Sequence, residues 1–177
     1  MKQVQLCWPA CLVLCLVVFS HHADAGAQVQ CPDKCSPQKT GVKTLAELTH
    51  TACHASTKFV FEVTVENMES SLTTDAYNIS MLEVFKYGAD DPMDQERIFI
   101  SVPSCKSQLG LKPGNNYLIM GQASSIKQVA GKYYYMFDEH TWLQYWPTDV
   151  QGQSDAYKNQ YDNLEQFRND MSFGCKS

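Results

Sequence analysis

Positive charge is scarce in this 177-residue chain. It has 14 lysine and arginine residues against 19 aspartate and glutamate residues, a formal net charge of −5, and only two arginines, Arg97 and Arg168. The lysines are spread thinly and form no run. This balance disfavours nucleic acid, heparin and anionic membranes as partners. It suits a partner that carries a basic patch or a metal.

The signatures of common enzyme classes are also missing. The chain contains no GxSxG, no HExxH, no pair of CxxC motifs and no glycine-rich phosphate loop. It shows no internal repeat and no low-complexity tract. We therefore expect no catalytic residues, no cofactor and a single domain.

Two histidine patterns suggest chemistry, and each has a simpler explanation. His50 and His54 lie four residues apart with Cys53 between them, a spacing at which two side chains could share a zinc ion. No fourth ligand is near in sequence, so we predict exposed helix histidines, a disulfide for Cys53 and no metal site. His140 follows Asp138 and Glu139, but no nucleophile accompanies them, which favours an exposed bend.

The first 27 residues have the composition of a secretory signal peptide. An apolar run from Leu6 to Phe19 follows Lys2, and small residues at 23–27 offer two cleavage sites. The run is short for a membrane span, which takes about 20 residues, although an uncleaved anchor is the alternative. We expect a secreted, extracellular protein whose remaining 150 residues form one domain with its own core.

Removal of this segment leaves an odd number of cysteines. In an oxidising compartment, five cysteines predict two disulfides and one residue that is free or bonded to another molecule. The five are Cys31, Cys35, Cys53, Cys105 and Cys175.

Hydrophobic periodicity predicts five strands between two helices. Thr44 and Glu47 have capping-box spacing at the start of the first helix, and apolar residues at steps of three and four from Tyr157 to Met171 predict the last helix. Without a βαβ rhythm, such an order favours a small closed barrel. The expected strands are 59–66, 77–87, 97–102, 116–122 and a bent strand over 133–146. Asn78 begins an N-glycosylation sequon, Asn78-Ile79-Ser80, near the start of the second strand.

Four segments make the chain resemble the netrin-like (NTR) family. They are residues 99–105, 116–121, 141–147 and the closing Phe173-Gly174-Cys175. Their order and spacing are most similar to the C-terminal NTR domain of complement components three, four and five. The resemblance covers residues 31–175. It implies a mainly β fold, an OB-like five-stranded barrel flanked by an N-terminal and a C-terminal helix, which tissue inhibitors of metalloproteinases share.

The resemblance also implies a role for each cysteine. Cys35 would pair with Cys105, and Cys53 with Cys175. Cys31 is similar to the cysteine through which the complement domain is bridged to another part of its own molecule. It is therefore the candidate for an intermolecular disulfide, such as that of a disulfide-linked dimer.

The chain departs from the complement pattern at two places. Gly152 and Tyr161 stand where the domain of component three carries an extra disulfide, so both partners are absent together. That relative ends in an asparagine whose carboxylate engages a metal in its partner zymogen. Here the end is Ser177, which makes Ser177 the candidate partner-binding residue.

Three functions follow as hypotheses. The first is a secreted, disulfide-linked, non-catalytic module that binds an extracellular protein, such as a complement component or a protease zymogen. The second is a protease inhibitor, which in the inhibitor family needs cysteine as the mature N-terminal residue. The third is a barrel that binds carbohydrate or lipid on its aromatic residues, which packed side chains in the barrel mouth would exclude.

Overall fold

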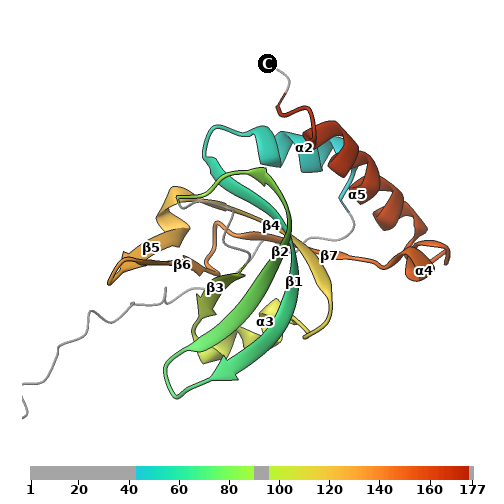
Figure 1. The fold of residues 1–177 in the computed structure, drawn as a ribbon. Helices are drawn as coiled ribbons and strands as arrows, with labels where there is room; N and C mark the ends of the chain where they lie inside the picture. The colour runs from blue at the N-terminus through green and yellow to red at the C-terminus, as the bar shows by residue number, and fades with distance from the viewer. Residues whose placement is uncertain (1–42, 90–95, 176–177) are drawn as a thin grey trace, which may run out of the picture.

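The computed structural model describes residues 43–89 and 96–175. They form a curled sheet with two helices packed side by side along one of its faces (Figure 1). The elements are α2 (Leu45–Cys53), β1 (Thr57–Ser70), β2 (Asp75–Lys86), β3 (Glu96–Ser101), η2 (Pro103–Cys105), α3 (Lys106–Leu109), β4 (Asn116–Gln122), η3 (Ala123–Ser125), β5 (Ile126–Val129), β6 (Lys132–Met136), β7 (Trp142–Trp146), α4 (Asp149–Gly152) and α5 (Lys158–Met171).

The sheet has seven strands in the order β5-β6-β3-β2-β1-β4-β7. All neighbours are antiparallel except β3 and β6, which run parallel. The predicted mainly β fold with a helix toward each end is confirmed. The prediction of five strands is wrong, and the ladder of described strands is open, with β5 and β7 as its edges.

One of the two additional strands arises in the segment predicted as one bent strand. Its first part is β6, which pairs with β3, and its last part is β7, which pairs with β4 on the other flank of the sheet. A tight bend divides them. Asp138 accepts the His140 N–H at 2.9 Å, and the Thr141 hydroxyl donates to the Met136 carbonyl at 3.0 Å. The strand β5 was not predicted, because Ile126-Lys127-Gln128-Val129 is too short to show a period.

Aromatic side chains fill the inner face of the sheet. Phe59 stacks on Phe61 at 5.1 Å between ring centroids, and Phe99 stacks on Tyr135 at 5.1 Å. Gly121 leaves room for this packing, since a Cβ there would come within 2.3 Å of the Phe59 ring. Within the described ranges the inner face of the sheet is therefore packed with protein side chains, and the binding of carbohydrate or lipid stays a prediction.

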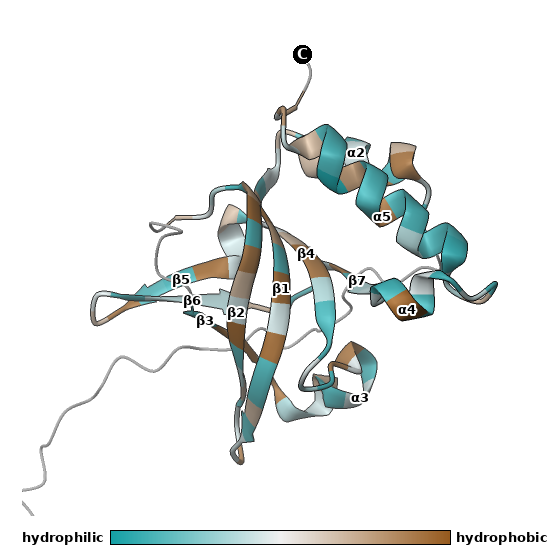
Figure 2. Ribbon diagram, turned by 45° about the vertical axis from the view of Figure 1, so that its right-hand side comes forward, coloured by the Kyte–Doolittle hydropathy of each residue, from teal (hydrophilic) through white to brown (hydrophobic). Residues whose placement is uncertain are grey.

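A second apolar layer lies between the outer face of the sheet and the two helices. Figure 2 shows hydrophobic residues along the strands and mostly hydrophilic ones on the visible side of α5. The strand β1 is consequently buried on both faces, which its alternating sequence did not predict. The layer consists of Leu48, Ala52, Val60, Leu118, Met120, Trp142, Trp146, Leu164, Phe167 and Met171.

Local signals set the ends of several elements. Thr44 and Glu47 form the expected capping box, in which the Glu47 N–H reaches the Thr44 hydroxyl at 3.3 Å and the Thr44 N–H reaches the Glu47 carboxylate at 2.9 Å. The Lys112–Asn115 turn closes with a 3.2 Å hydrogen bond, and Gly114 takes the positive φ of 78° that the turn requires. No helix within the described ranges is long and apolar enough to cross a membrane.

Candidate interaction site at the C-terminal helix

The helix α5 is positioned by an apolar stripe. Leu164, Phe167 and Met171 are buried against the outer face of the sheet, and Phe167 meets Phe85 of β2 edge to face at 5.4 Å. These residues recur at steps of three and four, which places them on one side of a helix. The predicted helix and its apolar face are confirmed. Its buried polar residue, Gln160, donates to the Tyr145 carbonyl of the edge strand β7.

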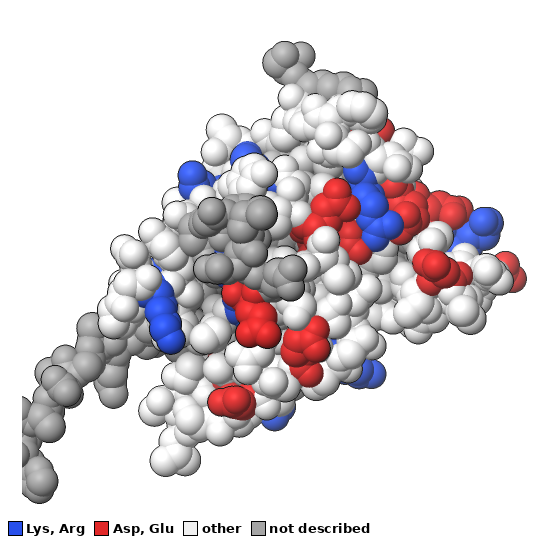
Figure 3. Space-filling model, viewed as in Figure 1, with Lys and Arg blue, Asp and Glu red and all other residues white. Residues whose placement is uncertain are grey.

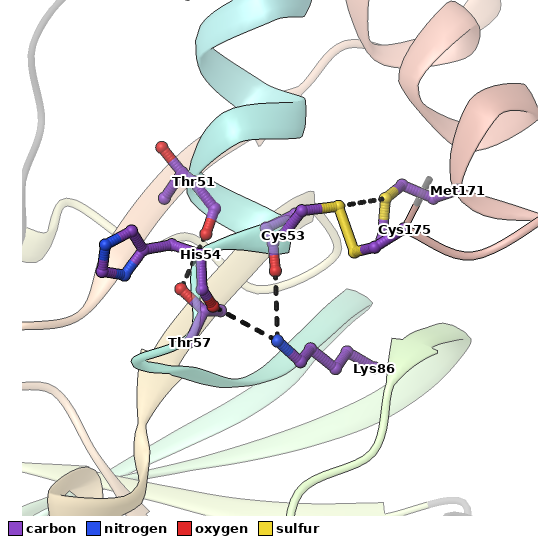
Figure 4. The surroundings of a disulfide bond; sticks show 8 residues. Thr51, Cys53, His54, Thr57, Lys86, Met171 and Cys175 are labelled. Atoms are coloured by element: carbon purple, nitrogen blue, oxygen red, sulfur yellow. Dashed lines mark hydrogen bonds between the residues drawn. A yellow bond between two sulfur atoms is a disulfide. The ribbon is translucent and has the colours of Figure 1, made fainter. Parts of the chain in front are cut away.

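A disulfide fixes the end of this helix to the end of α2. Cys53 and Cys175 are bonded, with 5.5 Å between their Cα atoms and 122 residues between them in sequence. Figure 4 shows the bond with Met171 beside it, and the Met171 Sδ lies 3.9 Å from the Cys53 Sγ. The predicted pairing of Cys53 with Cys175 is confirmed.

A lysine from the sheet supports the same junction. The Lys86 ammonium of β2 lies 3.4 Å from the carbonyl oxygens of Ala52 and His54, at the C-terminal end of α2 (Figure 4). A cation there satisfies carbonyl groups that have no partner within the helix and opposes the negative end of its dipole. The ends of α2, β2 and α5 are thus tied together by a disulfide and by charge.

An arginine joins α5 to an inner strand of the sheet, β1. The Arg168 guanidinium is bonded to the Glu62 carboxylate of β1, with 3.0 Å between Arg168 Nε and Glu62 Oε2, and to Glu165 at 2.7 Å. Glu83 of β2 lies 3.8 Å away. Figure 3 shows acidic side chains crowded around a basic one beside α5. The cluster has three carboxylates for one guanidinium and is therefore acidic as a whole.

Burial shifts the pKa values of Glu62 and Arg168 in this cluster. Burial raises the pKa of Glu62, and the hydrogen bond and charge of Arg168 offset this only in part. Burial alone would lower the pKa of Arg168, but the bond and charge of Glu62, with Glu165 and Glu83, raise it. Both shifts fit a carboxylate that is nearly inaccessible, with 4% of its side chain exposed, against 33% for Arg168. The sequence did not reveal this pair, because Glu62 alternates with the apolar Phe61 and Val63, a pattern typical of a strand with one exposed polar face.

Trp146 at the end of β7 completes the contact. The Arg168 guanidinium carbon lies 4.6 Å from the centroid of the Trp146 ring, and the indole N–H donates to Glu165 at 3.2 Å. The tryptophans of β7, Trp142 and Trp146, therefore pack in the layer beneath the helices, and Trp146 also positions α5.

The chain beyond α5 presents an exposed tip. Gly174 adopts a positive φ of 73° and donates its N–H to the Met171 carbonyl at 2.9 Å, which ends the helix. Phe173 is 83% exposed, although it is a large apolar residue one turn from a disulfide. Cys175 then returns the chain to α2. Ser177, the candidate partner-binding residue, lies outside the described residues.

The three histidines after residue 42 line one hollow. His50 and His54 of α2, with ring centroids 6.0 Å apart, lie beside a space of about 220 Å³ that His140 also borders. Within the described ranges, however, no three histidine, cysteine or acidic side chains are close enough to hold a metal ion. Cys53 is in its disulfide, and all three histidines are exposed.

The acidic neighbour of His140 has a structural role. Asp138 is buried, and its second oxygen accepts the Ser125 hydroxyl at 2.8 Å while the first accepts the His140 N–H. The expected bend is present, with His140 exposed, but the aspartate that shapes it is inside. Glu139 lies 3.8 Å from the His140 ring at the surface.

The remaining predicted sites have different outcomes. Asn78 lies on β2 between two buried neighbours, Tyr77 and Ile79, so its side chain is on the opposite, outer face, where it donates to Asn67 at 2.6 Å. Its glycosylation stays a prediction. Cys105 is buried and disulfide-bonded. Its expected partner Cys35 lies outside the described residues.

The two positions without the extra disulfide prove to be neighbours. A Cβ on Gly152 would come within 2.4 Å of the Tyr161 ring, and the Tyr161 hydroxyl donates to Asp149 of α4 at 3.0 Å. A glycine and a tyrosine thus fill the contact between α4 and α5 in this chain.

Comparison with known proteins defines the family. The model of the UNC-6/NTR/C345C module matches residues 50–159. The chain is 31% identical over 149 residues to complement C3 of Oncorhynchus mykiss, which covers 81% of this chain and 9% of that protein. It is also 29% identical over 126 residues to venom factor of Crotalus adamanteus and to cobra venom factor of Naja kaouthia. Each of these two matches covers 70% of this chain and 8% of the relative.

This chain therefore belongs to the NTR family. It spans less than a tenth of the length of these complement and venom relatives.

Proposed function

We propose that this protein is a secreted, non-catalytic module that binds an extracellular protein, namely a complement component or a protease zymogen. The observation that carries the proposal is the match to complement C3 over 81% of the chain. The described chain holds a disulfide, Cys53–Cys175, that joins the ends of α2 and α5. The acidic balance of the chain is consistent with a partner that presents a basic patch or a metal.

We infer that the exposed tip after α5 is the contact surface. Phe173 projects from a backbone that Gly174 and the disulfide hold in place, so its apolar ring is presented with little conformational freedom. Large exposed aromatic side chains are frequent binding hot spots. Ser177 follows Cys175 by two residues in the sequence. In the relatives the resemblance invokes, this end touches the partner zymogen.

A matched pair of variants tests this surface. Phe173→Ser removes the apolar ring at the tip, and Val150→Ser removes a comparably exposed apolar residue, 79% accessible, on α4. Immobilised chain from residue 28 onward, exposed to plasma of the same species, is expected to retain a complement component or a serine protease zymogen. Phe173→Ser should lose that protein and Val150→Ser should keep it. Equal retention by both variants, or capture of neither class of protein, contradicts the proposal.

We also propose that Cys35 pairs with Cys105 and that Cys31 forms an intermolecular disulfide. The support is the bonded state of Cys105 together with the odd number of cysteines, five, that remains after residue 27. Electrophoresis without reductant should show a dimer or mixed disulfide, and Cys31→Ser should abolish it. A wild-type monomer with a free thiol at Cys31 rejects the intermolecular bond.

The fold completes the proposal. We infer that β6 and β7 together replace the fifth strand of an OB-like barrel, since β6 lies parallel to β3 and β7 antiparallel to β4, with only residues 137–141 between them. The same fold serves in metalloproteinase inhibitors, the alternative function. N-terminal sequencing of the secreted chain decides between the two, because the inhibitor function requires Cys31 as the first residue.

A further inference from the structure

Two histidines at the C-terminal end of α2 have no role in the packing of the core or in the exposed tip after α5. His50 and His54 are both exposed, and their ring centroids lie 6.0 Å apart with the ring planes tilted by 48°. Residues four apart lie one above the other on the side of a helix, which explains why the two rings meet. Both rings border the same space of about 220 Å³, which is also bordered by His140.

The separation of the two rings is close to that of two imidazoles bound to one metal ion. A zinc–nitrogen bond is about 2.1 Å long, so two imidazoles on one ion have their centroids roughly 4.5–5 Å apart. Small rotations of the two side chains within their rotamers close a difference of about 1 Å. No packing opposes these rotations, because both side chains are exposed.

Ser56 determines which ring nitrogen of His54 is available. The Ser56 hydroxyl lies 2.7 Å from His54 Nδ1, and the Ser56 N–H donates to the same nitrogen at 3.2 Å. Nδ1 is thereby occupied, and Nε2 is the nitrogen that is open to a ligand. With a metal ion on Nε2, the ring carries its proton on Nδ1, where the Ser56 hydroxyl accepts it. Histidines that bind metals in proteins are commonly oriented in this way through their second nitrogen. Figure 4 shows the His54 ring turned away from the disulfide.

The groups around the two histidines leave such a site open to solvent. Cys53 is in a disulfide, so its sulfur is not a ligand. Glu47, one turn before His50, is held in the capping box by Thr44 and is paired with Lys43 at 3.8 Å. Within the described ranges no set of three histidine, cysteine or acidic side chains could hold the ion together. Water therefore takes the remaining positions on a bound ion, as at the open position of a catalytic zinc site.

We propose that His50 and His54 form an exchangeable site for a divalent metal ion that favours imidazole, such as Zn²⁺ or Cu²⁺, with His54 binding through Nε2. Imidazole suits these ions, whereas Ca²⁺ and Mg²⁺ favour oxygen ligands. Once one ring binds the ion, the other is already within reach, so the pair has a higher affinity than either histidine alone. The missing fourth ligand, which argues against zinc in the sequence, excludes only a closed structural site.

Calorimetric titration of Zn²⁺ into the chain from residue 28 onward tests the site without any partner. The chain is made without an affinity tag and with Cys31→Ser, so that neither added histidines nor a free thiol competes for the ion. One ion per chain should bind. His50→Gln and His54→Gln should each weaken binding by roughly tenfold or more, because one imidazole remains. His140→Gln, at the third exposed histidine that borders the same space, is the matched control and should leave the affinity unchanged.

Electron paramagnetic resonance of the Cu²⁺ complex provides a second readout. The hyperfine pattern should show two imidazole nitrogens in the parent chain and one in His50→Gln or His54→Gln. All three substitutions are at exposed positions, so the variants should fold as the parent chain does.

Three results overturn the site. The first is the absence of saturable binding. The second is equal affinity in the parent chain, His50→Gln and His54→Gln, which assigns the ion to scattered surface groups. The third is a loss in His140→Gln as large as that in His54→Gln, which is incompatible with a site made by two histidines of α2. None of these results depends on the binding proposed for Phe173, so the two proposals fail separately.

Discussion

Arg168 and Glu62, separated by 106 residues in sequence, form the ion pair that joins the helix α5 to the strand β1 of the sheet. The Glu62 carboxylate on the sheet is nearly inaccessible, whereas the Arg168 guanidinium on the helix is one-third exposed. The buried member of the pair therefore belongs to the sheet. The Trp146 ring beneath the guanidinium adds a cation–π contact at 4.6 Å. The stability of the helix layer should depend on this pair more than on any surface charge.

Removing the arginine should be strongly destabilising. Arg168→Met leaves the Glu62 charge buried without its main partner, which typically costs about 3–5 kcal/mol in unfolding free energy. Lys158→Met on the same helix is the control, because its partner Asp162 lies 3.3 Å away in an exposed pair. Such a pair contributes about 0–1 kcal/mol. Urea denaturation at neutral pH measures both, and equal losses would contradict the importance of the buried pair.

The raised pKa of Glu62 predicts a pH dependence. A carboxyl group whose pKa is higher in the folded than in the unfolded chain binds more protons in the folded state. The free energy of unfolding therefore falls as the pH rises from the pKa of the unfolded state through the pKa of the folded state. Above the folded pKa the loss is complete and constant. Relative to Glu62→Gln, which cannot titrate, the wild-type protein should lose stability as the pH rises above about 4.5 and then reach a plateau.

Denaturation midpoints of both proteins at several pH values from 4 to 8 test this sign. Glu165→Gln is the control, since Glu165 bonds the same arginine from a more exposed position. A wild-type protein that gains stability over Glu62→Gln as pH rises would show that Arg168 outweighs the burial of Glu62.

The Cys53–Cys175 bond should contribute strongly to stability. It closes a loop of 122 residues, for which chain entropy gives about 5 kcal/mol. In a Cys31→Ser background, Cys53→Ala, Cys175→Ala and the double variant should lose similar amounts, because each removes the same bond. Chemical denaturation without reductant measures this, and losses that add in the double variant would mean that packing around each cysteine dominates.

We expect that glycine is needed at position 152 because the Tyr161 ring leaves no room for a side chain, and not because of the backbone conformation. Gly152→Ala places a Cβ within 2.4 Å of the Tyr161 Cγ, at the rigid base of the side chain, and should cost about 1–3 kcal/mol through overpacking of α4 against α5. In a Tyr161→Ala background the same substitution should be nearly neutral. Thermal unfolding of the four proteins gives the coupling, and an equal cost in both backgrounds would rule out the contact as the cause.

Several elements could be predicted because their signals are local. The capping box at Thr44, the strand Asn116–Gln122 and the apolar stripe of α5 depend on residues a few positions apart. The pairing of Cys53 with Cys175 was implied by the resemblance to the NTR family, which depends on four segments spread over the chain. These predictions agree with the structure because neither packing nor topology opposes the local preferences.

Other features could not be predicted because long-range packing decides them. The sequence of residues 133–146 by itself predicts one strand. The segment is divided at Asp138 because its first part pairs with β3 and its last part pairs with β4 on the other flank of the sheet. Glu62 alternates correctly for a polar face, but the helices cover that face, so the carboxylate is buried and needs Arg168. The sequence by itself determined the family, the helix and strand periods and the acidic balance. The tertiary structure decided which polar groups are enclosed, because burial of a charge depends on what the rest of the chain places over it.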